Sequence, residues 1–173
     1  MESKQKILIG IDPDTEKNGV AMKINKEFLL YNLNFFTLYE LLKNIKENEI
    51  FFESEIEVYV ECGFLNKANR HFKEQESMEF NGKISERVGA NHETAKKICE
   101  MCESLKLDFH QVRPTKSKIN SEKFKEITGY KKRSNQEQRD ALMLIWEFVF
   151  LISVPKLLIL MSLKKIFYHV ISE

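Results

Sequence analysis

Two apolar segments of this chain each end in a single acidic residue, and this pattern constrains the fold more than any other feature of the sequence. Ile7-Leu-Ile-Gly-Ile is followed by Asp12, and Ile56-Glu-Val-Tyr-Val is followed by Glu61. Both segments have the apolar, β-branched content of buried strands. A carboxylate beside a core must be paired, hydrogen-bonded or bound to a metal ion. Two further acids, Glu137 and Asp140, are spaced one helical turn apart, and together the acids predict a shared cation.

Strand patterns come first along the chain, and helix patterns follow. The predicted strands are Lys6–Ile11, Gly19–Ile24, Glu27–Leu33, a segment ending at Glu61, and Asp108–Val112. The predicted helices are one opened by a capping box at Thr37-Leu-Tyr-Glu40, one over Asn91–Leu105, one over Ser121–Thr128 that Gly129 stops, and one starting near Ser134. A polar loop is expected between Gly63 and Gly82. This order predicts an α/β fold with a mixed sheet and helices on its faces.

Length, charge and cysteine content set modest bounds on function. The 173 residues suit one domain with a real core. The net charge is only +1, but the segment from Gln111 to Arg139 holds nine basic residues and three acids, so one end of the molecule is expected to be basic. The three cysteines and the absence of a signal pattern after Met1 favour a reducing cytoplasm. Cys99 and Cys102 fall inside a helical pattern and are interpreted as core thiols.

The motifs and their order resemble the ribonuclease H-like superfamily and, within it, the RuvC-type Holliday-junction resolvases. Ile9-Gly10-Ile11-Asp12-Pro13 with Gly19 is similar to the first-strand motif of that family, and Glu61 to the acid that closes its fourth strand. Glu137-Gln-Arg-Asp140-Ala-Leu is similar to the motif of its final helix. The likeness covers roughly residues 6 to 150. It departs from the family at Asp14, where the family has glycine, and in a shorter stretch between Thr128-Gly129 and the last acids, which favours a phage-like or divergent relative.

The resemblance implies a ribonuclease H-like, mixed five-stranded sheet with helices on both faces, and a magnesium-dependent nuclease. The implied metal-binding and catalytic residues are Asp12, Glu61, Glu137 and Asp140. Two Mg²⁺ ions per active site, for which Mn²⁺ can substitute, would offset the charge of a phosphodiester and support its hydrolysis. Magnesium prefers hard carboxylate oxygens, so a few Asp and Glu side chains suffice. No histidine has a partner pattern typical of a general base.

Each acid also has a plainer interpretation. Glu137 lies three residues after Ser134, so Ser-x-x-Glu is equally a capping box. Asp140 follows Arg139 and could form a solvated pair on the helix surface. Asp12 could begin an Asx turn that caps only its own backbone. Glu61 is harder to explain without a ligand, because an acid at the end of a buried strand gains little there.

Basic and aromatic residues supply candidate DNA contacts. The candidates are Lys116 and Lys118 after the fifth strand, Arg70 and Phe72 in the polar loop, and Lys131, Lys132 and Arg133 before the last helix. Arg70 and Phe72 are assigned by the resemblance alone. The run of three basic residues is equally typical of a solvated loop.

The predicted function is resolution of four-way DNA junctions by paired symmetric nicks, which requires a homodimer because one small domain holds one active site. An RNA-processing nuclease of the same fold, or a binding module without catalysis, is the alternative. An actin-type or sugar-kinase phosphotransferase is excluded, because the chain is too short and glycine-poor for a second phosphate loop and an adenosine pocket. Residues 1–150 are predicted to form the nuclease domain. The apolar residues 151–173 are predicted to be a packed or dimer-forming appendage rather than a membrane span, because Glu147, Pro155 and Lys156 interrupt the apolar run.

Overall fold

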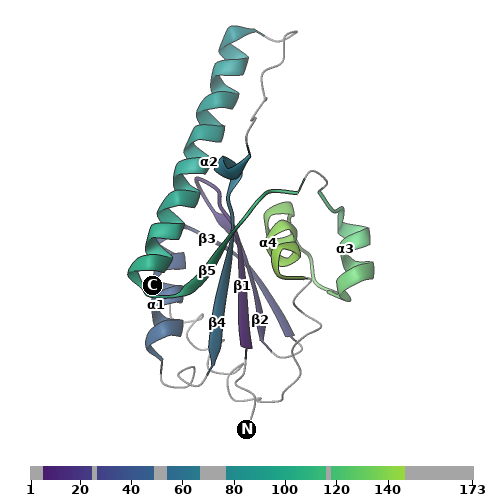
Figure 1. Ribbon diagram of the computed structural model, residues 1–173. Coiled ribbons are helices and arrows are strands. Elements are labelled where there is room, and N and C mark those ends of the chain that lie inside the picture. Colours follow the sequence, from purple (N-terminus) through teal and green to yellow (C-terminus); the bar gives the residue numbers. More distant parts are fainter. Residues whose placement is uncertain (1–5, 25–26, 49–53, 67–76, 116–117, 147–173) are drawn as a thin grey trace.

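The computed structural model describes residues 6–24, 27–48, 54–66, 77–115 and 118–146, and these form one sheet covered by helices on both faces (Figure 1). The strands are β1 (Lys6–Asp12), β2 (Asn18–Ile24), β3 (Glu27–Leu33), β4 (Glu55–Glu61) and β5 (Asp108–Val112). The helices are α1 (Phe35–Glu47), the short 3-10 turn η2 (Gly63–Leu65), α2 (Met78–Ser104), α3 (Ser121–Thr128) and α4 (Gln136–Trp146).

The sheet is mixed, with the order β3-β2-β1-β4-β5. The β1–β2 and β2–β3 pairs are antiparallel hairpins, whereas β1–β4 and β4–β5 are parallel and are joined by crossovers through α1 and α2. The carboxyl ends of β1 and β4 therefore meet at the same edge of the sheet. The predicted α/β class and the five-stranded mixed sheet with helices on both faces are confirmed.

Alternating side chains of β1 divide the core into two layers. Ile7, Ile9 and Ile11 face α1 and α2, where Leu38, Leu41, Ile98 and Cys102 among others complete a fully buried cluster. Leu8 faces the other way, into a smaller cluster with Ala21, Tyr59, Phe124 of α3 and Ala141, Leu142 and Ile145 of α4. Both layers are visible in Figure 1, with α1 and α2 on one side of the sheet and α3 and α4 on the other. The prediction that Cys99 and Cys102 are core thiols is confirmed by their burial.

Two helix starts differ from the sequence expectation. The cap of α1 is Asn34, whose side chain accepts a hydrogen bond of 2.9 Å from the Thr37 amide, so the predicted box at Thr37 and Glu40 is wrong. Helix α2 begins at Met78 rather than near Asn91, because the Ser77 hydroxyl caps it by accepting from the Phe80 amide. Its first turns extend beyond the sheet (Figure 1), so they lack the apolar periodicity that a packed helix shows.

Some predictions concern segments outside the described residues. These are the DNA contacts of Arg70, Phe72 and Lys116, the domain boundary after residue 150 and the character of the tail. Across the ranges that are described, no helix has the length and apolar content needed to cross a bilayer.

Candidate active site

Two strand-end acids lie side by side on the face of the sheet that α4 covers. Ile11 of β1 pairs with Val60 of β4, so Asp12 and Glu61 come next on adjacent strands. Side chains alternate along a strand, which places Asp12 on the same face as Leu8, and Glu61 on the same face as Tyr59. Both acidic side chains are half-buried.

Two glycines allow α4 to lie directly on this face. A Cβ atom on Gly10 would come within 2.0 Å of the Ala141 carbonyl oxygen, and one on Gly19 within 2.3 Å of the Glu137 carbonyl oxygen. Any side chain at either position would push the helix backbone outward. Gly19 is also the cross-strand partner of Asp12, so the close approach of α4 sets Glu137 beside Asp12.

Helix α4 starts with a capping box, but not the predicted one. The Asn135 side chain accepts from the Gln138 amide at 3.0 Å, and the Gln138 side chain accepts from the Asn135 amide at 3.1 Å. The interpretation of Ser134 and Glu137 as a capping box is therefore wrong, and the Glu137 carboxylate is not committed to the helix end.

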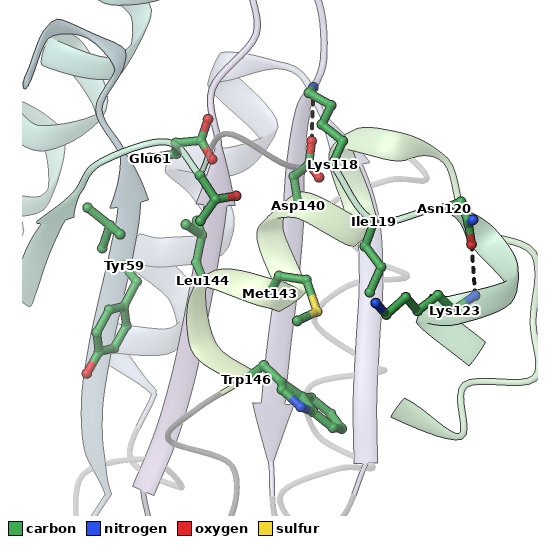
Figure 2. Close-up of a pocket in the computed structure, with 12 residues that line it drawn as sticks. Tyr59, Glu61, Lys118, Ile119, Asn120, Lys123, Asp140, Met143, Leu144 and Trp146 are labelled. Atoms are coloured by element: carbon green, nitrogen blue, oxygen red, sulfur yellow. Dashed lines mark hydrogen bonds and ion pairs between the residues drawn. The ribbon is translucent and has the colours of Figure 1, made fainter. Parts of the chain in front are cut away.

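Asp140 is not a solvated surface acid. Its side chain is 13% exposed and forms an ion pair of 3.0 Å with the Lys118 ammonium (Figure 2). It also accepts a hydrogen bond of 2.6 Å from the Gln136 amide group. The neighbouring Arg139 instead donates to the carbonyls of Ile119 and Ser134 and to Gln136, so the predicted Arg139–Asp140 pair is not formed.

The turn after β1 is held by Asp14 rather than by Asp12. The Asp14 carboxylate accepts from the Glu16 and Lys17 amides, and the Asp14 amide donates to the Asn18 side chain at 3.1 Å. These bonds make the Asx turn that was considered for Asp12. Within the described ranges Lys106 is the one non-glycine residue with a positive φ, so Asp14 does not adopt the left-handed backbone conformation that favours glycine.

The acid quartet, which is Asp12, Glu61, Glu137 and Asp140, is short of positive charge. Burial raises the pKa of Asp12 from its ordinary 3.8 to about 8. The negative charges of the three other acids add to this rise, and Lys118 opposes it only in part. Burial and the charge of Asp140 likewise raise the pKa of Glu61. A protein that gathers four carboxylates and one lysine in this way disfavours its own ionised state unless a cation binds.

The acid quartet also changes the pKa of Lys118. Partial burial works to lower the pKa of its ammonium group, but the bond to Asp140 and the charges of Asp12 and Glu61 outweigh this and raise it. The side chain is still 68% exposed, so the ammonium lies where the site opens to solvent. Lys131, Lys132 and Arg133 are exposed in the connection between α3 and α4.

A second group of metal-ligand side chains was missed by the sequence analysis. In the part of the chain that the structure describes, Glu57, Asp108 and His110 are the group of three whose donor atoms all lie within 4.8 Å of one another. No three members of the acid quartet are spaced so closely. Two ions about 3.5–4 Å apart need a wider ligand shell than one ion does, and carboxylates without a cation repel one another.

Within this Glu57 cluster, Glu57 already has protein partners on both carboxylate oxygens. One Glu57 oxygen forms an ion pair with Lys6, and the other accepts a hydrogen bond of 2.7 Å from the Tyr59 hydroxyl. Burial alone would raise the pKa of Glu57, but these partners lower it below its ordinary value. His110 stacks on the Tyr59 ring with centroids 4.7 Å apart. The cluster lies four residues along β4 from Glu61, about 13 Å away, so it is a separate candidate metal site.

No family model matches the chain, and no curated protein is similar to it. Solved structures that are similar to it include RuvC of Thermus thermophilus in complex with a Holliday junction substrate, at a TM-score of 0.42 and 14% identity over 80% of this chain and 89% of that chain. Another is Thermus thermophilus RuvC, at a TM-score of 0.40 and 14% identity over 80% of this chain and 90% of that chain.

Proposed function

We propose that the protein is a magnesium-dependent, structure-selective endonuclease that resolves four-way DNA junctions as a homodimer. The observation that carries this proposal is the gathering of four acids from β1, β4 and α4 at one end of one sheet face, where burial, reinforced by their mutual repulsion, raises the pKa of Asp12 to about 8. The junction-specific part of the proposal comes from the sequence motifs at Asp12, Glu61 and Asp140.

The donor set fits a hard divalent cation. All four acids offer carboxylate oxygens, the ligand type that Mg²⁺ and Mn²⁺ prefer. Asp12 stands between Glu61 on the neighbouring strand and Glu137 on α4, so its carboxylate would hold the metal together with both neighbours. When bound, the ions would activate water and offset the charge on a phosphodiester.

The protein's own groups then have separate tasks. Glu61, Glu137 and Asp140 would complete the set of carboxylate ligands around Asp12. Gln136 holds one oxygen of Asp140 and so restricts its rotation. Lys118, at the open side of the site, is placed to contact a phosphate of the substrate strand. Lys131, Lys132 and Arg133 would extend this basic surface.

Paired nicks across a junction require two active sites related by a two-fold axis. One described domain supplies one acid quartet, so the proposal needs a second copy of the chain. A dimer is expected to release two nicked products together, whereas a monomer would accumulate singly nicked junctions.

Cleavage of a labelled mobile four-way junction tests the function directly. With magnesium, the wild-type protein is expected to cut the junction at least about tenfold faster than a linear duplex of the same sequence. The two DNAs present the same bases, so a difference in rate reports recognition of the branched shape. Asp12→Asn should not cut the junction. Its matched control is Asp108→Asn, which removes an acid on the same sheet face outside the quartet and should cut at the wild-type rate. Equal cutting of both DNAs would defeat the junction assignment, and faster cutting of structured RNA would replace it with RNA processing. If the protein binds the junction without magnesium and never cuts it, the enzyme assignment fails and the protein is a DNA-binding module.

A further inference from the structure

A pocket of about 570 Å³ opens directly from the acid quartet along the same face of the sheet. Glu61, Asp140 and Lys118 line one end of it, and Tyr59, Met143 and Trp146 line the other (Figure 2). The volume is within the range of about 300–1,000 Å³ that is typical of small-molecule and nucleotide sites. Helix α4, β5 and the segment leading into α3 form its walls.

The far end of the pocket is apolar and aromatic without being closed. Met143, Leu144 and Trp146 lie within the last turn of α4, and each remains half-buried although its side chain is apolar. Ile119 faces them from the opposite wall (Figure 2). A flat, uncharged ring system is the kind of group that such a surface accepts, and stacking on an aromatic side chain contributes about 1–3 kcal/mol per base.

Positive charge lines the rim of this apolar surface. Lys118 stands at the acid end, and Lys123 of α3 extends its ammonium group toward Ile119 and Met143 (Figure 2). In the described ranges no acid forms an ion pair with Lys123. These parts of the pocket match the parts of a nucleotide next to a scissile phosphate. The acid end would take the reacting phosphodiester, the apolar surface the base, and the lysines the flanking phosphate.

We propose that this pocket receives one unpaired nucleotide of the DNA substrate, with its base on Met143, Leu144 and Trp146 and its phosphate at Lys123. The inference rests on the proposed nuclease function and names the part of the substrate that the site selects. A paired base in a linear duplex reaches such a pocket only after unstacking and unpairing, which costs a few kcal/mol. At a branch point the stack is interrupted, so a nucleotide there leaves its pair at lower cost. The pocket thereby gives the site a physical basis for preferring branched DNA.

Trp146 is the only tryptophan in the chain, so its fluorescence reports on this pocket alone. The full chain is titrated with a 5′-phosphorylated thymidine tetranucleotide in EDTA, without divalent ions. Saturable quenching of Trp146 is expected. Lys123→Ala should weaken the apparent affinity about tenfold, the effect of losing one charge-assisted hydrogen bond. Lys125→Ala, on the same helix but away from the pocket, should stay within about twofold of wild type.

A tetranucleotide of abasic sites separates base binding from phosphate binding, and it should not quench Trp146. Absence of quenching would overturn the pocket assignment. Equal weakening of the affinity by Lys123→Ala and Lys125→Ala would overturn it as well. So would equal affinity for the thymidine and the abasic tetranucleotides. If quenching persists in a protein that neither binds magnesium nor cuts DNA, the nuclease proposal fails and the pocket assignment stands.

Discussion

Replacing Asp12 with asparagine is expected to abolish magnesium-dependent cleavage and also to make the fold more stable at pH 8. The loss of cleavage should exceed about 100-fold, because removing even an outer partner of a metal site costs about 10–100-fold. The gain in stability follows from the surroundings of Asp12, where burial and three neighbouring acids raise the pKa of this carboxyl to about 8.

The direction of the pH effect follows from proton uptake. Folding raises the pKa of Asp12 from 3.8 to about 8, so between these values the folded protein holds a proton that the unfolded chain has released. This group therefore lowers the free energy of unfolding as pH rises from about 4 to about 8, by at most about 1.4 kcal/mol per pH unit. Above pH 8 Asp12 is ionised in both states, so the free energy of unfolding falls no further on account of this group. An isosteric amide carries no such cost, so Asp12→Asn should gain about 2 kcal/mol or more at pH 8 and little at pH 4.

Urea unfolding of both proteins in EDTA at pH 4.5, 6 and 8 measures this difference. Comparing the two proteins cancels the titration of groups distant from Asp12, which both proteins share. A variant that is less stable than wild type at pH 8, or equally more stable at every pH, would show that Asp12 is not held in a repulsive cluster.

Gly10→Ala is expected to destabilise the protein by about 3 kcal/mol or more and to abolish metal binding. The added Cβ would lie 2.0 Å from the backbone oxygen of Ala141, and backbone, unlike a flexible side chain, cannot rotate away. Overpacking a well-packed core typically costs about 1–3 kcal/mol. Because the clash forces α4 off the sheet, it also moves Glu137 and Asp140 away from Asp12.

Gly89→Ala is the matched control for this substitution. Gly89 lies in α2 with no atom within 4 Å of its added Cβ, so alanine there should stabilise the protein by up to about 1 kcal/mol through helix propensity. The measurement is the free energy of unfolding of both variants in urea. Similar values for Gly10→Ala and Gly89→Ala would contradict the close contact between β1 and α4.

Local patterns were sufficient to predict the sheet. The bounds of β3 and β5 agree with the predicted segments, and β1, β2 and β4 agree within one residue or at the predicted end. The αL conformation of Gly129, with φ of 68°, ends α3 as expected. These features depend on residues that are adjacent in the sequence, so composition and spacing determine them.

Helix ends were less predictable because several polar residues compete for each cap. Asn34 rather than Thr37 caps α1, and Asn135 rather than Ser134 caps α4. In both places the chain offers two capping residues within three positions, and tertiary packing decides between them. The second case matters for function, since it leaves the Glu137 carboxylate available to the acid quartet.

Long-range register could not be read from the sequence, and it is what creates the Glu57 cluster. The parallel pairing of β4 with β5 sets Glu57 opposite Asp108 and Tyr59 opposite His110. A shift of one residue would place these side chains on opposite faces. The local sequence around His110 does not indicate this group. Glu57 comes close to Asp108 and His110 only through the pairing of β4 with β5, which the crossover between these strands sets.

Calorimetric titration of the full chain with Mn²⁺ at pH 8 tests the central claim, that the acid quartet is the metal site, against the Glu57 cluster. The variants are Asp12→Asn and, as the matched control, Glu57→Gln. The account predicts that Asp12→Asn weakens Mn²⁺ binding by at least about tenfold while Glu57→Gln leaves it within about twofold of wild type. Unchanged binding in Asp12→Asn, with loss in Glu57→Gln, would contradict the account and move the metal site to Glu57, Asp108 and His110.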